Sequence, residues 1–241
     1  MTHIVHPYIH RLGVIRDWKS RWFASDPKKY REYLRVDRGI RTLLEKKLRG
    51  MYVASIDIER GDKIVRIVLR TSRPGLIIGR SGEGAVKLKK EIDMLLRTLS
   101  LSEIPEVKLD IEEIRTPESN AMIVAQMIVE GLEKHMPFRR VMKQTVEKVI
   151  ANRDVEGVRV MVSGRLGGAD MSRTEELKRG RIPLQTLRAD IDFARARAVD
   201  KFGTMGVKVW IYRGDIFADR AKRSEERPEQ PRGRFEHART R

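Results

Sequence analysis

Four consecutive residues, Gly79-Arg80-Ser81-Gly82, combine the residue types needed to bind a phosphate through the backbone. Glycine lets a chain turn sharply and come close to a ligand where a Cβ atom would collide. We expect a helix to begin at Glu83, and the first turn of a helix offers unpaired N–H groups and a positive dipole end to an anion. Arg80 adds a full positive charge. The same residues also suit a plain turn between two helices, and the flanking sequence has to decide.

A second group of candidates is the basic cluster Arg139, Arg140 and Lys143. Residues 138–152 have the apolar spacing of a helix. On a helical wheel the three cations lie with Glu147 on the side away from the apolar face, which comprises Val141, Met142, Thr145, Val146 and Val149. Such a strip can contact successive phosphates of a nucleic-acid strand. It is also what an ordinary solvated helix face looks like, so the pattern leaves both interpretations open.

Residues 1–35 form a basic arm that holds six of the fourteen aromatic side chains: Tyr8, Trp18, Trp22, Phe23, Tyr30 and Tyr33. Rings interleaved with Arg and Lys suit stacking on bases while the cations meet phosphates. The alternative is that the rings anchor the arm to its own protein. A glycine-rich basic loop at residues 165–173 can also approach a nucleic-acid backbone closely. The candidate RNA contacts in the arm, in this loop and just after it are His6, Arg11, Arg16, Lys19, Trp22, Arg165, Arg173, Lys178 and Arg179.

No catalytic or metal-binding pattern is found in the sequence. His3, His6 and His10 have no Cys or carboxylate beside them, and the chain has no cysteine. Residues 79–84 lack the Lys-Ser/Thr that would complete the phosphate-binding P-loop of a GTPase. Asp190 and Asp192 can pair on one strand face, but two carboxylates without further ligands are more often surface positions. We therefore expect a protein that is not an enzyme, with no metal, no cofactor and no small-molecule substrate.

The charge of the chain indicates a nucleic-acid partner. Its 241 residues hold 51 Lys plus Arg against 34 Asp plus Glu, a net charge of +17 with a pI near 10.4. The excess is uneven, because residues 1–50 have 13 basic and 5 acidic side chains whereas residues 51–115 have 12 and 11. With no long apolar run and no signal peptide in the sequence, we expect no membrane contact and a cytoplasmic location.

The elements around residues 79–82 decide between the two interpretations of that loop. Apolar spacing predicts a helix over residues 36–50, which Asp37 caps and Gly50 ends. A second apolar stripe, from Ala85 to Leu99, predicts a long helix after the loop. Alternation predicts strands over residues 51–59, 63–71 and 106–113. The order helix, strand, strand, short helix, G-x-x-G loop, helix, strand is that of a type II KH domain, which binds single-stranded nucleic acid through the loop.

A second domain follows from Pro117. Helices are predicted over residues 118–136 and 138–152, a short Ala/Arg-rich helix near residues 194–201, and strands over residues 157–164, 181–192 and 205–213. From Ala218 the chain is rich in Arg, Glu and Pro, which predicts a disordered tail. The predicted fold class is α+β: a basic aromatic arm (1–35), a type II KH domain (36–115), an α/β domain with two helices packed on a mainly antiparallel sheet (116–215) and a basic tail (216–241).

Nine stretches of the sequence carry a resemblance: residues 5–7, 11–13, 18, 22–24, 73–83, 138–143, 162–169, 180–192 and 206–211. They resemble one family, the small-subunit ribosomal protein S-three in its bacterial or organellar form. The resemblance extends from residue 5 to about residue 215. The stretches at 162–169 and 180–192 are highly specific.

The resemblance implies a structural RNA-binding protein in the head of the small ribosomal subunit, at the entrance for messenger RNA. Its implied partners are small-subunit rRNA, messenger RNA and neighbouring small-subunit ribosomal proteins. It also implies that Arg139, Arg140 and Lys143 correspond to a basic helix that faces incoming message and helps to unwind it. A free KH-domain regulator of messenger RNA is compatible with the charge and is the alternative. It differs in being expected as a soluble species rather than in small subunits.

Overall fold

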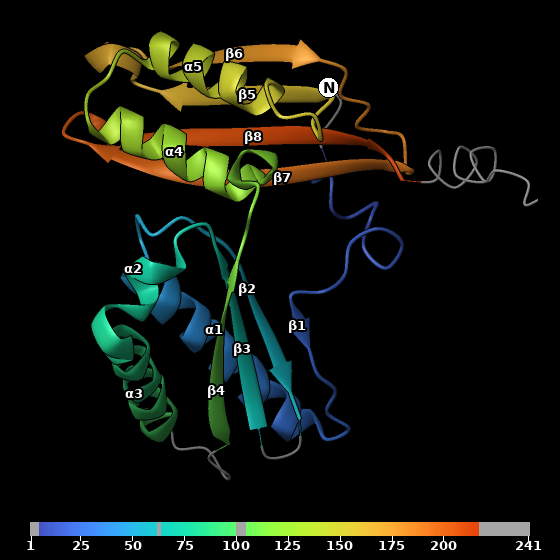
Figure 1. Cartoon of the computed structure of the whole chain (residues 1–241), viewed down its shortest axis with the longest axis vertical. Helices are drawn as coiled ribbons and strands as arrows, with labels where there is room; N and C mark the ends of the chain where they lie inside the picture. The colour runs from blue at the N-terminus through green and yellow to red at the C-terminus, as the bar shows by residue number, and fades with distance from the viewer. Residues whose placement is uncertain (1–4, 62–63, 100–104, 217–241) are drawn as a thin grey trace, which may run out of the picture.

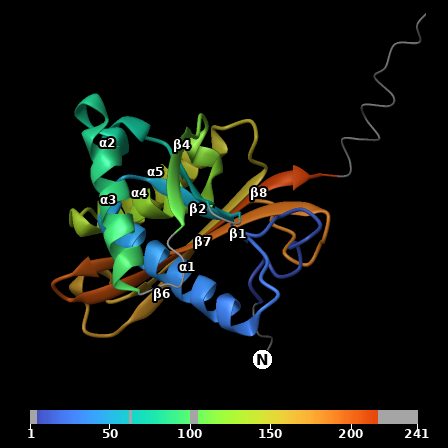
Figure 2. The ribbon, with the colours of Figure 1, turned by 90° about the horizontal axis from the view of Figure 1, so that it is seen from below.

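The computed structural model describes residues 5–61, 64–99 and 105–216. Figure 1 shows two α+β domains one above the other along the long axis of the molecule. The amino-terminal arm, in dark blue, runs beside strand β7 of the second domain and then down to the sheet of the first domain (Figures 1 and 2). The predicted disordered tail lies, beyond Ile216, outside the described residues.

The first domain is built on a sheet with the strand order β1-β2-β3-β4. β2 (Val53–Arg60) and β3 (Ile64–Thr71) are antiparallel, whereas β1 (Ser20–Arg21) and β4 (Glu106–Glu113) run parallel to their neighbours. Its helices are α1 (Pro27–Lys47), α2 (Pro74–Ile78) and α3 (Glu83–Thr98). α1 and α3 share one core with the strands, to which they contribute Val36, Ile40, Leu44, Ile92 and Leu96. This confirms the predicted order of elements.

Helix α1 begins at Pro27 rather than at the predicted Val36. Asp26 caps it, accepting a hydrogen bond from the Lys28 N–H at 2.9 Å, and proline suits the first position because that N–H would have no helical partner. Asp37, predicted as the cap, is buried inside the helix. The predicted start was wrong because it was based on buried apolar residues. The first turns of α1 hold mainly charged and aromatic residues and bury little apolar surface.

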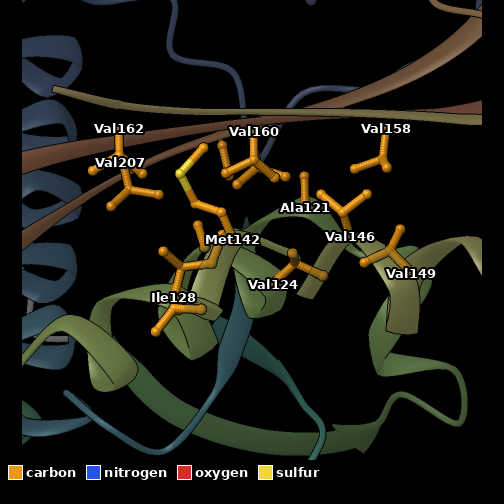
Figure 3. Packing of buried hydrophobic residues seen from close by; sticks show 14 of the residues in the cluster. Ala121, Val124, Ile128, Met142, Val146, Val149, Val158, Val160, Val162 and Val207 are labelled. Carbon is orange, nitrogen blue, oxygen red and sulfur yellow. The ribbon is translucent and has the colours of Figure 1, made fainter. Parts of the chain in front are cut away.

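The second domain is an antiparallel sheet with the strand order β6-β5-β8-β7. The strands are β5 (Gly157–Gly164), β6 (Arg173–Gly180), β7 (Ala189–Asp200) and β8 (Gly203–Asp215), with short 3-10 turns at Pro117–Ser119 and Leu166–Gly168. Helices α4 (Ala121–Glu133) and α5 (Phe138–Ile150) cover one face. Figure 3 shows the core between them, where Val158, Val160 and Val162 of β5 face Met142 and Val146 of α5. Two helices on an antiparallel sheet are as predicted.

Two details of this domain differ from the prediction. Residues 194–201 are predicted as a helix, but residues 194–200 lie in strand β7. There Ala194, Ala196 and Ala198 pack on the helix side, while Arg195 and Arg197 are exposed. That alternation has the two-residue period of a strand. Residues 181–188 precede a strand instead of forming one, and the missed strand is β6 at the sheet edge. Its sequence is polar, so pairing with β5 rather than intrinsic propensity makes it a strand.

Helix α4 joins the two domains. It begins at Ala121, later than the predicted Glu118, because the Asn120 side chain caps its first turn. Ile123 packs in a cluster with Tyr52 and Ala54 of the first domain. A hydrogen bond from the Gln126 side chain to the Val53 carbonyl oxygen at 3.0 Å and an ion pair between Arg49 and Glu133 at 2.5 Å also fix the contact. None of the helices in the described part of the chain is long and apolar enough to cross a membrane.

Candidate nucleic-acid interface

The loop at residues 79–82 joins α2 to α3 at one end of the first domain (Figure 1). Gly79 and Gly82 have φ values of 72° and 81°, a region that glycine adopts without strain. Gly84, in the first turn of α3, is needed for a different reason. A Cβ atom there would lie 2.4 Å from the carbonyl oxygen of Ile77, so only glycine lets α2 approach α3 this closely.

The amino-terminal end of α3 is open to an anion. Arg80 and Ser81 are exposed, and no side chain caps the helix. The helix runs for 16 residues, so the partial positive charge at its start is fully developed. Ser81 has a φ of 52°, which places it in the left-handed region within the turn. Loop, helix end and Arg80 together suit a bound phosphate.

The three cations predicted on α5 share its exposed face. Arg139 donates two hydrogen bonds to Glu175 of strand β6, at 3.1 and 3.3 Å, and the hydrogen bond lowers the pKa of that carboxyl. Arg140 and Lys143 make no ion pair within the described residues. The strip therefore offers two cations directly, and a phosphate that binds Arg139 has to replace Glu175.

The glycine-rich loop after β5 is held by its own arginine. Arg165 donates to the carbonyl oxygens of Ala169 at 2.9 Å and Phe202 at 3.3 Å, and it pairs with Asp170 at 3.1 Å. Arg165 therefore stabilises the conformation of the loop in addition to giving it a positive charge.

The other three candidates in this region lie on strand β6. Arg173 pairs with Glu175 at 3.4 Å. Lys178 and Arg179 are exposed and, within residues 5–61, 64–99 and 105–216, form no ion pair. Lys178 and Arg179 are thus better placed than Arg173 to bind an anion.

Arg11 is fully buried and cannot reach RNA in this structure, which corrects its prediction as an RNA contact. Its guanidinium donates at 2.6 to 3.1 Å to four carbonyl oxygens, those of Pro7, Leu184, Thr186 and Ala189. A planar group with five donors is suited to such a cluster of acceptors. Arg11 ties the arm to the segment that leads into β7.

A polar cluster around Asp192 holds the next part of the arm. The buried Asp192 carboxylate accepts hydrogen bonds from the Tyr8 hydroxyl and, at 2.9 Å, from the Ala121 N–H at the start of α4. Burial and the adjacent carboxylate raise the pKa of Tyr8. Arg16, predicted as an RNA contact, pairs with Asp190 at 2.7 Å and is half-buried. The two aspartates are anchors for the arm, and Arg16 is largely committed to them.

Trp22 anchors the arm to α1, which favours the packing alternative for this ring. Its indole N–H donates to Asp37 at 2.7 Å, and its ring packs against two tyrosines of α1, Tyr30 and Tyr33. Trp18 and Phe23, in contrast, expose 62% and 87% of their surface. These two rings are available for stacking.

His6 is also a packing residue. Its ring meets the Phe193 ring edge-on at 4.7 Å between centroids, and its Nδ1 accepts a hydrogen bond from the Tyr8 N–H. Partial burial, and then the charges of Arg195 and Lys19, lower the pKa of His6, which favours the neutral ring. Lys19 is exposed and stays a candidate contact.

Four cations that the sequence did not single out lie on the outer face of the second-domain sheet: Arg159, Arg195, Arg197 and Lys208. The alternation of Ala and Arg over residues 194–198 is typical of a strand, and as a strand it places Arg195 and Arg197 together on one face. No local pattern marks Arg159 or Lys208, because their neighbours come from strand register.

Comparison with known proteins agrees with this architecture. Residues 39–119 match the KH domain family, and residues 128–211 match the family described as ribosomal protein S3, C-terminal domain. Three relatives carry the name small ribosomal subunit protein uS3. They are 47% identical in Caldicellulosiruptor bescii (92% of this chain, 96% of the relative), 44% in Endomicrobium trichonymphae (92% and 92%) and 41% in Coxiella burnetii (94% and 96%). The chain therefore belongs to the ribosomal protein S3 family, uS3, as its sequence resemblance indicated.

Proposed function

We propose that this chain is a structural RNA-binding component of the small ribosomal subunit, located on cytoplasmic ribosomes in the subunit head. Its family is structural and non-enzymatic, and the relatives are named for the small subunit. The proposed partners are small-subunit rRNA, messenger RNA and neighbouring small-subunit ribosomal proteins. The net charge of +17 supports RNA partners in particular.

The uncapped start of α3 is the observation that carries RNA binding by the first domain. Backbone N–H groups of the first helical turn point along the helix axis, and Gly79 and Gly82 remove the side chains that would block a strand. Arg80 supplies a charge-assisted hydrogen bond to the same phosphate. This site recognises a backbone, and bases would be held beside it.

We assign messenger RNA at the channel entrance to the α5 strip of Arg139, Arg140 and Lys143. Exposed cations on one helix face can hold one strand of a hairpin by its phosphates while the ribosome draws the message inward. The hairpin then opens with energy from translocation. The Glu175 partner of Arg139 keeps that guanidinium in position until a phosphate replaces the carboxylate.

Sedimentation separates this proposal from the free-regulator alternative. The tagged full chain is expressed in bacteria, and lysates are fractionated on sucrose gradients before and after a moderate salt wash. A subunit component stays with the small-subunit peak after the wash. Recovery of the washed chain only in the soluble top fractions would favour the free KH regulator.

A further inference from the structure

The outer face of the second-domain sheet carries five cations that are direct or diagonal neighbours. Arg195 of β7 lies directly opposite Lys208 of β8, and Arg159 of β5 lies directly opposite Lys178 of β6. Lys208 in turn is opposite Met161, which is two residues from Arg159 on β5, so Lys208 and Arg159 are diagonal neighbours on the same face. Arg197 extends the row along β7. We call this row, Arg197-Arg195-Lys208-Arg159-Lys178, the sheet-face stripe.

The stripe crosses all four strands of the sheet. Adjacent strands lie about 4.8 Å apart and alternate residues of one strand about 6.6 Å apart, so five cations fall within roughly 20 Å. That spacing between neighbours is of the order of the spacing between phosphates along an RNA strand. α4 and α5 pack on the opposite face, which is the near side in Figure 1.

Within the described residues only one of the five stripe cations is neutralised by an ion pair. Arg159 pairs with Glu176 of the neighbouring strand. The other four cations form no ion pair there, although like charges directly opposite each other destabilise a sheet. Opposed cations such as Arg195 and Lys208 therefore cost stability that an anion from outside the chain would restore.

The first domain shows the ordinary solution to the same problem. On the outer face of its sheet Arg66 lies opposite Lys108, again two cations side by side. There, however, Arg66 pairs with Asp110 at 2.5 Å and with Glu59 at 3.4 Å, and Arg70 is also held by two carboxylates. The outer sheet face of the first domain is crossed by internal ion pairs, whereas that of the second domain keeps an excess of positive charge. Unpaired cations are therefore a property of the second domain and not of exposed sheets in general.

The surroundings of the stripe favour a phosphate backbone over bases or a protein. Trp210, the large ring beneath it, is 2% exposed and lies under the Arg159 guanidinium at 5.0 Å, so it cannot stack on a base. Protein interfaces are built on exposed aromatic and apolar cores and are depleted in Lys. The exposed Lys19 of the arm adds to the basic surface, since its charge and that of Arg195 both act on His6.

We propose that the sheet-face stripe binds the phosphate backbone of structured small-subunit rRNA. This inference rests on the proposed ribosomal function and adds a site to it. Message is assigned to α5 on the other face of the sheet, so the stripe contacts a different RNA segment. In this arrangement the second domain is held between rRNA on one side and message on the other.

The test measures binding of the full-length chain to a small-subunit rRNA transcript by filter binding at several salt concentrations. The variant Arg195→Gln/Lys208→Gln removes two opposed stripe cations. Arg66→Gln/Arg70→Gln, which removes two cations of the first-domain sheet that are each paired with two carboxylates, is the matched control. Arg195→Lys/Lys208→Arg keeps the charge. We expect the stripe variant to bind about tenfold more weakly, with a salt slope reduced by about 2, while both other variants resemble wild type.

Each other outcome overturns a stated part. Equal affinity and slope for wild type and stripe variant remove the stripe as an RNA site, whereas a wild-type chain without salt-dependent rRNA binding contradicts the proposed function itself. If the stripe variant loses affinity for poly(U), measured in parallel, but not for the rRNA transcript, the stripe binds single-stranded message instead. If the stripe variant binds the rRNA transcript normally but no longer enters small subunits, the stripe binds an acidic protein instead. A thermal melt checks folding, and if the double variant is unfolded, Lys178→Gln at the exposed sheet edge must still lower the slope by about 1.

Discussion

Replacement of Arg11 by Met should detach the arm from the second domain. The side chain has no exposed surface and its guanidinium makes four hydrogen bonds to carbonyl oxygens. Net contributions of hydrogen bonds to a charged group are about 1.5–3 kcal/mol each, but those of one group are not additive. Met regains part of the packing while the carbonyls lose their donor. We therefore expect a loss of about 3–5 kcal/mol in the free energy of unfolding of the arm and second domain.

Such a loss is large enough for a simple thermal measurement. For a chain of this size about 1 kcal/mol moves the midpoint by about 2–4 °C, so Arg11→Met should melt at least about 6 °C lower. Limited trypsin digestion should cut the arm of the variant early. Arg35→Met is the matched control, because Arg35 is exposed on α1 and should leave the melt unchanged. Arg11→Lys keeps the charge without the planar fork and should fall between the two.

One result would refute this account of Arg11. If Arg11→Met melts like wild type but loses rRNA affinity with a reduced salt slope, the side chain leaves its buried site to bind RNA, and the original prediction from the sequence is right after all. A destabilised variant whose rRNA affinity recovers at low temperature supports the structural role.

Three further predictions concern the proposed RNA surfaces. The wild-type chain should lose about a thousandfold or more in rRNA affinity between 50 and 200 mM salt, measured by filter binding, and a flat titration would contradict a phosphate-based interface. In the full chain Arg80→Asp/Ser81→Asp should weaken RNA binding with an unchanged melt, since both side chains are exposed and Asp tolerates the positive φ of Ser81; unchanged affinity would leave the loop a structural turn. Ribosomes with the variant Arg139→Ala/Arg140→Ala/Lys143→Ala should translate unstructured message normally but stall more on a downstream hairpin, and the variant chain should still enter subunits. Glu175→Gln, which frees Arg139, should stall less than wild type. Equal stalling of wild type and both variants in a single-turnover assay would mean that the α5 cations form only a solvated face.

Where local signals were strong, the sequence predicted the structure residue by residue. Strand β4 has its predicted bounds of Glu106 and Glu113, and β5 has its predicted bounds of Gly157 and Gly164. β4 alternates clearly between apolar and polar residues, and β5 repeats valine at every second position from Val158 to Val162. The loop at 79–82 was found because glycine spacing is a local property. The strand at β6 was missed because its polar residues become a strand only by pairing with β5.

The candidate contacts divide according to their partners. Lys178 and Lys19 stay exposed, whereas Arg11 disappears into a cluster of carbonyls and Trp22 turns its indole N–H to Asp37. All four belong to residue types common at RNA interfaces, and nothing within a few positions of each tells them apart. Their partners come from segments far away in the chain, so the sequence pattern could not assign them.

Residue types, periodicity and total charge by themselves determined the two α+β domains, the G-x-x-G loop, the basic helix face and the expectation of an RNA partner. These properties depend on neighbours within one or two turns or on simple counts. Tertiary structure alone decided which cations are free. A cation is neutralised or buried by groups that strand register and domain packing bring within a few ångströms, as Asp110 does for Arg66, while the same register leaves Lys208 facing Arg195. Electrostatic energy depends on those distances and on burial, and neither can be predicted from the order of the residues alone.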